Sequence, residues 1–469
     1  MQAPKDRTRL SRRSFVQLSA WNALALMACR KVPTGSLSAP GTVGPPEPRF
    51  MDFGPLVTNP EAILELPMGF HCAVVQQFHE PMTCGNRMPA QPDGMTCHID
   101  DSGNYVLLRN HEMGDGDWMA KPGRAFPTNY FKDERHPDAA YDDTMYGGVS
   151  RVVIDPAQLL TVLPTGDARS AVKSSNLVLA GTQFNCSGGH VPEGWVSCEE
   201  TDNAGHGYAF LTKVDDEALV DPHARRITSW GRLKREGISL EINSGMVFMT
   251  EDHKNGCLYR FVPDNRREPM GAGTLQALVV EGVTDTDPTT PLVAGSSWKT
   301  SWVDVTDPQA EEQSCRKQAQ SLGASRFNRC EGSVLVGSSL WFIASTAGPV
   351  GAGQVYRLDL NTGQLHLEVQ VTDRAVLSMP DNLTITPWGD LLMAEDNYNA
   401  EGGATHQYLR CLRPDGSLYD FGRNPNNTPD DCGAEMSGPC FSPDGTVLFV
   451  NIQTPVGITL AIHGPWKQA

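Results

Sequence analysis

A paired pattern of polar and apolar residues recurs six times along the chain and constrains its fold more than any other feature. In each copy a polar or acidic residue precedes a short apolar strand, a tight turn follows, and a second apolar strand ends in polar residues. The six openers are Asp93, Asn185, Glu236, Glu331, Asp381 and Glu435. The six closers are Asn110-His111-Glu112, Cys198-Glu199-Glu200, Glu251-Asp252, Ser345-Thr346, Glu395-Asp396 and Asn451. Because an antiparallel hairpin returns to where it began, each opener lies near its closer.

The spacing of these copies predicts a β-propeller. Openers are 51 residues apart from 185 to 236, 50 from 331 to 381 and 54 from 381 to 435, which suits one four-stranded blade per copy. The longer gaps predict insertions at about 113–145 and 264–325. We therefore expect residues 53–469 to form an all-β, six-bladed β-propeller with loop and helix insertions.

The second insertion carries a helix signal. Asp307-Pro308 combines a favoured N-cap residue with proline at the first helical position, and the polar segment QAEEQSCRKQAQSL follows. We expect a helix here, which is either a lid above the acidic ends of the hairpins or a surface decoration.

The first 52 residues read as an export signal and a tether. Ser11-Arg12-Arg13-Ser14-Phe15 has the twin-arginine form, and the apolar stretch that follows is too short and polar to span a membrane. Residues 1–29 are therefore expected to engage the twin-arginine export machinery and direct the protein to the periplasm or cell surface. Leu26-Met27-Ala28-Cys29 resembles a lipobox, so a lipid anchor at Cys29 is one alternative. Residues 30–52 form a Pro/Gly/Ser-rich tether.

Composition restricts the partners. The formal net charge is −17, which disfavours nucleic acid because phosphates would be repelled. Outside a lipid anchor at Cys29 no membrane contact is expected. Twelve cysteines in an exported chain suggest disulfides, although their connectivity is not readable from the sequence.

The acidic hairpin ends predict bound cations. A single carboxylate at a strand end often only accepts backbone N–H groups of a turn. Six hairpins arranged radially would instead pool these carboxylates on one face, where like charges repel unless cations lie between them. The chief basic residues near the openers are Arg235 and Arg329, so metal ions are the favoured compensation.

Strand alternation refines the set of metal ligands. Cys198 and Glu200 share one side of a strand while Glu199 takes the other. The residues expected to face the central channel are Cys198, Glu200, Asp252 and Asp396, with Glu199, Glu251 and Glu395 as further candidates. Oxygen ligands suit Ca²⁺ or Fe³⁺, and a thiolate favours a transition metal beside calcium. The alternative for Cys198 is a buried thiol or half a disulfide.

Five segments carry a resemblance to a known family. They are NCSGGHVPEGWVSCEE (185–200), LKREGISLEINSGMVFMTEDHKNGCLYRF (233–261), FNRCEG (327–332), MPDNLTITPWGDLLMAED (379–396) and EMSGPCFSPDGTVLFVNIQTP (435–455). As a set they resemble the PhoX alkaline phosphatases over about residues 60–460. The resemblance implies a six-bladed propeller, twin-arginine export, and a site that holds Fe³⁺ and Ca²⁺ and hydrolyses small-molecule phosphate monoesters.

The resemblance also implies individual roles. The family's CEE motif falls on Cys198-Glu199-Glu200, with the cysteine as an iron ligand, and its phosphate-contacting arginine falls on Arg329. The full set of metal candidates is Cys198, Glu199, Glu200, Glu236, Glu251, Asp252, Glu331, Asp381, Asn382, Glu395, Asp396 and Glu435. The catalytic candidates are Arg329, Arg235 and His190.

Three positions depart from the family pattern. Arg235 stands where the family has histidine, Cys330 where it has proline, and His190 where a lysine would follow the glycine pair. Arg235 is expected either to add a second phosphate clamp or to fill a lost ligand position, and neutral His190 is a weaker clamp than lysine.

Two other functions remain open from the sequence. One is a calcium-dependent propeller lactonase or phosphodiesterase, whose site needs one Ca²⁺ and no thiolate. The other is a non-catalytic binding propeller with structural metals.

Overall fold

The computed structural model describes residues 53–59, 62–119, 139–286, 292–397, 406–425, 435–453 and 457–466. The predicted signal with Cys29, the tether and residues 120–138 of the first insertion lie outside these ranges. Within the described ranges, no helix is long and apolar enough to cross a membrane.

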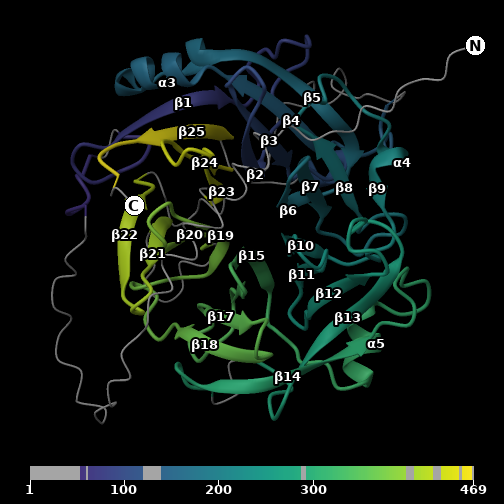
Figure 1. Cartoon of the computed structure of the whole chain (residues 1–469). Coiled ribbons are helices and arrows are strands. Elements are labelled where there is room, and N and C mark those ends of the chain that lie inside the picture. Colours follow the sequence, from purple (N-terminus) through teal and green to yellow (C-terminus); the bar gives the residue numbers. More distant parts are fainter. Residues whose placement is uncertain are drawn as a thin grey trace, which may run out of the picture.

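Antiparallel strands make up most of the regular structure, and they are arranged as four-stranded units around a centre (Figure 1). The first three units are β2 (Pro92–Ile99), β3 (Tyr105–His111), β4 (Gly147–Ile154) and β5 (Val172–Thr182); β6 (Asn185–Val191), β7 (Gly194–Glu199), β8 (Ala209–Lys213) and β9 (Arg226–Ile227); and β10 (Arg235–Leu240), β11 (Val247–Glu251), β12 (Leu258–Pro263) and β13 (Gly273–Val280). The last three are β15 (Cys330–Val336), β16 (Ser339–Ala344), β17 (Gln354–Asp359) and β18 (Gln364–Gln370); β19 (Pro380–Ile385), β20 (Leu391–Glu395), β21 (Tyr408–Leu412) and β22 (Leu418–Arg423); and β23 (Met436–Phe441), β24 (Leu448–Ile452), β25 (Ile458–His463) and β1 (His71–Gln77).

The innermost strands form a closed ring. Each of β2, β6, β10, β15, β19 and β23 contacts the next, and β23 returns to β2. Figure 1 shows these strands around the centre, with β5, β14, β18 and β22 toward the periphery. The ring is closed by β1, the first strand in sequence, which pairs with β25 near the end of the chain. The predicted all-β propeller is confirmed, and six such units lie in the described part of the chain.

Part of the second insertion belongs to the propeller blades. Its residues supply β13, the outer strand of the third unit, and β14 (Ser297–Asp304), which pairs with both β13 and β18 and joins two units into a nine-stranded sheet. The helix α5 (Cys315–Ser321) begins after Ser314 rather than at Pro308. Asp307 instead accepts the backbone N–H groups of Gln309 and Glu311 in a local turn, which competes with a helix start.

Other helices are short. They are α2 (Gly116–Met119), α3 (Pro156–Val162) and α4 (Pro222–Arg225), with 3₁₀ turns η1 (Leu163–Thr165) and η2 (Arg169–Ala171). Helix α3 begins at Pro156, where Asp155 accepts two backbone N–H groups of its first turn, as expected of an N-cap.

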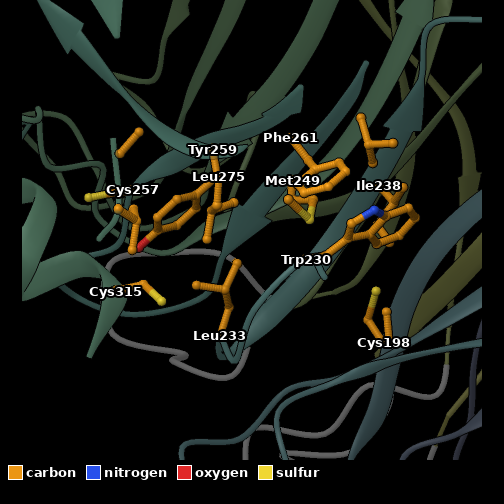
Figure 2. Close-up of a cluster of buried hydrophobic side chains, with 14 of the residues drawn as sticks. Cys198, Trp230, Leu233, Ile238, Met249, Cys257, Tyr259, Phe261, Leu275 and Cys315 are labelled. Carbon is orange, nitrogen blue, oxygen red and sulfur yellow. The ribbon is translucent and has the colours of Figure 1, made fainter. Parts of the chain in front are cut away.

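The hydrophobic core is divided among the interfaces between neighbouring units. One cluster joins the β6–β9 and β10–β13 units through side chains that include Trp230, Ile238, Met249 and Phe261 (Figure 2). Because each unit is apolar on both faces, its side chains pack against the units before and after it. The polar residues therefore lie at the strand ends near the axis of the propeller.

Candidate metal centre

A register shift interrupts the pairing between the first and second strands of every unit. The shifts lie between Pro92/Met95, Asn185/Gly188, Arg235/Ile238, Cys330/Ser333, Pro380/Leu383 and Ser437/Cys440. Such bulges twist a strand and re-aim a side chain. At the start of each inner strand, side chains therefore do not alternate regularly between the two faces of the sheet.

One backbone hydrogen bond aligns the six units. In each, an amide just after the second strand (the return position) donates to a carbonyl just before the first strand (the start position), at 2.8–3.0 Å. The return positions are Glu112, Glu200, Asp252, Ser345, Asp396 and Gln453, and the start positions are Gln91, Phe184, Lys234, Arg329, Met379 and Glu435. Two residues after each start position is the axial position, which holds Asp93, Cys186, Glu236, Glu331, Asp381 or Ser437.

This alignment corrects two predicted openers and one closer. Asn185 lies one residue before the axial Cys186, and its side chain bonds to the Ser197 hydroxyl at 2.8 Å. Glu435 occupies a start position, two residues before the axial Ser437. Asn451 lies two residues before the return residue Gln453. The bulges explain these differences between the predicted and observed positions, because each bulge changes the number of residues between paired positions.

Axial and return side chains, together with Glu435 from a start position, form a connected series of donor groups. Within each group one ligand atom from every residue lies within 4.8 Å of the others. The four groups are Asp93-Glu112-Cys186, Cys186-Glu200-Glu236, Glu236-Glu331-Asp381 and Asp381-Asp396-Glu435. Each group shares a residue with the next, so adjacent ions would share ligands.

Glu236 belongs to two of these groups, and no hydrogen-bond donor of the described residues contacts its carboxylate. Both of its carboxylate oxygens are buried and lack a hydrogen-bond partner among the described residues. Burial raises its pKa well above the usual range, and the charges of Asp381 and Glu200 raise it further. An unpaired buried carboxylate costs free energy, which a cation at this position would offset. The donor chemistry therefore fits metal ions, since oxygen ligands suit hard cations such as Ca²⁺ and Fe³⁺.

The pKa shifts predict an unusual pH dependence for protein freed of metal. Burial raises the pKa of Asp381 to about 8, and the nearby charge of Asp396 adds to the effect. Between the ordinary carboxyl pKa and this value the folded state binds more protons than the unfolded state, so stability falls as pH rises, by about 1.4 kcal/mol per pH unit for each such proton. We expect urea unfolding in chelator to show decreasing stability from pH 5 to pH 8. With saturating metal the decrease should vanish or reverse, because deprotonated carboxylates bind the ions. A rising stability in chelator would contradict this.

The predicted carboxylate pairs divide into two roles. Of the second members, Glu200 and Asp396 belong to the donor groups and Asp252 does not, whereas the first members are buried away from these groups. Glu199 accepts the backbone N–H groups of Gly207 and Tyr208 and a hydrogen bond from His206. These hydrogen bonds stabilise the segment that follows β7.

The other two first members are held in the same manner. Glu251 pairs with Arg316 of α5 at 2.8 Å and accepts from the Tyr259 hydroxyl at 2.7 Å. Glu395 accepts the Ser378 N–H at 2.7 Å and pairs with buried Arg410 at 3.3 Å. The structure therefore does not bring Glu199, Glu251 and Glu395 into the donor groups.

The thiol among the carboxylates is Cys186. Its Sγ lies 3.6 Å from Asp93 Oδ2 and belongs to two donor groups. Cys198 is instead fully buried in the apolar cluster with Trp230 and Ile238 (Figure 2). Strand β7 ends at Glu199, and Glu200 forms a bridge with Lys234, so the alternation that linked Cys198 to Glu200 stops there. The ten cysteines in the described ranges are all free thiols.

Two further predicted residues lie apart from the donor groups. Arg235 is fully buried and donates to the carbonyls of Trp230 and Gly231 at 3.0 and 2.9 Å. His190 is four residues along β6 from Cys186, roughly 13 Å at strand rise, and its ring stacks on His98 at 4.4 Å.

Asn382 borders the donor groups. Its Nδ2 donates to Asp381 Oδ1 at 2.9 Å, and its Oδ1 accepts the Gly438 N–H at 2.6 Å.

Two partly exposed cations border the donor groups. Arg329 pairs with Asp252 at 2.8 Å and with Glu331 at 3.1 Å. Its φ of 54° is left-handed, as are those of the start residues Gln91, Phe184 and Met379, so this conformation belongs to the turn that precedes the first strand in four of the units. Lys234, which was not predicted, pairs with Glu200 and Asp252.

The sequence analysis gave Asp93 as an opener and Glu112 as part of a closer but did not include them among the metal candidates, and it did not single out Cys186. A usable signal was present, because the axial residue precedes a small residue in most copies, as in Asp93-Gly94 and Cys186-Ser187. Comparing PDG, NCS, REG and CEG in that frame places Cys186 level with Glu236. The same signal is present in the last unit, where Ser437 precedes Gly438, and it places Ser437 rather than Glu435 at the axial position.

Comparison with known proteins shows the family and the fold. A model of the family described as alkaline phosphatase PhoX matches residues 51–456. Among solved structures, Pseudomonas fluorescens PhoX in complex with vanadate, a transition state analogue, is similar with 17% identity and a TM-score of 0.63, covering 87% of this chain and 97% of that chain. A gluconolactonase from Xanthomonas campestris has 11% identity and a TM-score of 0.39, with 84% and 97% covered. No curated protein matches the chain. The chain belongs to the PhoX family of alkaline phosphatases and is a phosphatase hydrolase.

Proposed function

We propose that the enzyme hydrolyses small-molecule phosphate monoesters with the help of Fe³⁺ and Ca²⁺ ions. The observation that carries this proposal is the series of four donor groups, in which both oxygens of the buried Glu236 carboxylate lack a hydrogen-bond partner among the described residues. The residues that would hold the ions are Asp93, Glu112, Cys186, Glu200, Glu236, Glu331, Asp381, Asp396 and Glu435. When bound, such ions polarise phosphoryl oxygens and lower the pKa of water.

The protein's own residues supply orientation and charge. Arg329 offers a planar guanidinium beside the donor groups, and this group suits phosphate oxygens. Burial alone would raise the pKa of Asp252, but Arg329 and Lys234 hold it well below the usual range. Asp252 therefore stays ionised and keeps both cations directed toward the site. Cys186 would favour a transition metal in the groups it joins.

Substrate class and metal dependence are tested together. Purified protein should hydrolyse p-nitrophenyl phosphate at alkaline pH, lose activity in chelator, and regain it with Fe³⁺ and Ca²⁺. Elemental analysis of protein isolated after native export should find both metals. Greater activity on a lactone or on bis(p-nitrophenyl) phosphate, with calcium alone, would instead support the calcium-dependent alternative.

We also propose export by the twin-arginine route to the periplasm or cell surface. The support is the Ser11-Arg12-Arg13-Ser14-Phe15 sequence followed by a short apolar stretch. Lipidation at Cys29 is the alternative to release. Replacing Arg12-Arg13 with Lys-Lys should retain the protein in the cytoplasm.

A further inference from the structure

Two cations from neighbouring units meet at one carboxylate. Lys234 Nζ lies 2.9 Å from Asp252 Oδ2, while Arg329 Nε lies 2.8 Å from Oδ1 and Nη2 lies 3.1 Å from Oδ2. Asp252 therefore accepts charge-assisted hydrogen bonds at both oxygens. It does not belong to any of the four donor groups.

Lys234 and Arg329 are structurally equivalent. Each occupies the start position of its unit, and its carbonyl accepts the amide of the return residue, Asp252 or Ser345. Successive units therefore deliver both side chains from the same level of the ring. The other four start positions hold Gln91, Phe184, Met379 and Glu435, so this pair of units is the one with positive charge at that level.

The exposure of these side chains differs from that of their partner. The side chains of Lys234 and Arg329 are 29% and 21% exposed, whereas that of Asp252 is 3% exposed. The two cations thus border solvent while the carboxylate that joins them lies behind. Lys234 is further tied to Glu200, and Arg329 to Glu331, both members of the donor groups. A ligand at these cations would also lie beside the proposed metal ions.

We propose that Lys234 is a second substrate-contacting cation, which binds phosphate oxygens together with Arg329 and selects dianionic phosphate monoesters over diesters. Asp252 is a positioning residue, which holds the two cations before the substrate arrives. This inference rests on the proposed phosphomonoesterase function. Two cations at one place suit a terminal phosphoryl group that carries two negative charges, because a diester has one fewer charge to pair.

The test compares Lys234→Met with Lys234→Arg and with Lys254→Met. Lys254 is exposed and lies two residues after Asp252, so its substitution removes the same charge nearby without touching the clamp. Binding of inorganic phosphate is measured by calorimetry on metal-loaded protein, and metal content by elemental analysis. We expect Lys234→Met to weaken phosphate binding by about 10- to 100-fold, as for loss of a hydrogen bond to a charged group, with metal content retained. Lys234→Arg should keep most of the affinity, and Lys254→Met should match the parent.

The kinetic arm measures specificity. Lys234→Met should lower kcat/KM for p-nitrophenyl phosphate more than for bis(p-nitrophenyl) phosphate, so the preference for the monoester narrows by about 10-fold or more. Unchanged phosphate affinity and an unchanged monoester preference in Lys234→Met would overturn the inference while the parent's activity upholds the proposed function. Because the calorimetric arm needs no turnover, it also decides the role of Lys234 if the parent proves inactive on monoesters. Loss of metal from Lys234→Met, with normal phosphate affinity in the protein that remains loaded, would likewise overturn it.

Discussion

Glu236→Gln should make the metal-free protein more stable and the enzyme inactive. Both carboxylate oxygens of Glu236 are buried without a hydrogen-bond partner in the described part of the chain, and the residue belongs to two donor groups. Removing its charge relieves repulsion, so in chelator at pH 8 we expect the free energy of unfolding to rise by about 1–3 kcal/mol. With ions the order reverses, because the variant loses a shared ligand and the stabilisation that binding supplies. Activity should fall about 1,000-fold, since ions contribute several kcal/mol to the transition state.

The measurements are urea unfolding with and without metal, and kcat on p-nitrophenyl phosphate. Glu199→Gln is the matched control, because Glu199 is equally buried but bonds to backbone N–H groups and His206. That variant should lose stability in both conditions and keep its metals. If Glu236→Gln destabilised the metal-free protein, or retained full metal stoichiometry, Glu236 would not be a ligand.

Cys186→Ser should remove the transition metal and most of the activity, and Cys198→Ser should do neither. Cys186 Sγ belongs to two donor groups, while Cys198 lies among apolar side chains. A thiolate bound to Fe³⁺ gives visible charge-transfer colour, so the spectrum distinguishes the two cysteines directly. We expect iron content and colour to be lost in Cys186→Ser, with activity reduced about 100-fold or more.

The Cys198→Ser variant serves as the control with the same chemical change. It places a hydroxyl in an apolar cluster, so it should cost about 1–3 kcal/mol of stability and leave colour and specific activity in place. The reverse outcome, with colour lost only in Cys198→Ser, would return the iron ligand to the CEE motif.

Most of the fold was predictable because hairpin repeats are local. Turn sequences and β-rich runs recur at blade spacing, and the residues that form β12, β17 and β21 are among the β-rich segments. The ends of the second insertion were harder. Its β13 and β14 pair with strands outside it, and such long-range pairing leaves little trace in local sequence.

The site was predictable in kind but not residue by residue. The recurrence of a carboxylate just after the second strand placed Glu200 and Asp396 among the candidates, and both belong to the donor groups. Residue counting failed at the end of β7, where Cys198 was expected to face the channel, and at the bulge of the last unit, where Glu435 was taken for an axial residue. Arg235 illustrates a different difficulty. A buried arginine that satisfies backbone carbonyls has the same sequence signature as a substrate clamp, and only the packing separates them.

The closure of the ring by β1 and β25 has a consequence for when the metal centre comes into being. Gln453 of the last unit donates to Asp93 of the first at 2.6 Å, across 360 residues of chain. A nascent chain that ends before Gln453 contains only one side of that contact, and contacts between distant parts of a chain form late and slowly. The ions therefore have no complete binding site until the last unit has been made. Complete metal binding therefore follows closure of the ring, and its free energy contributes to keeping the first and last units together.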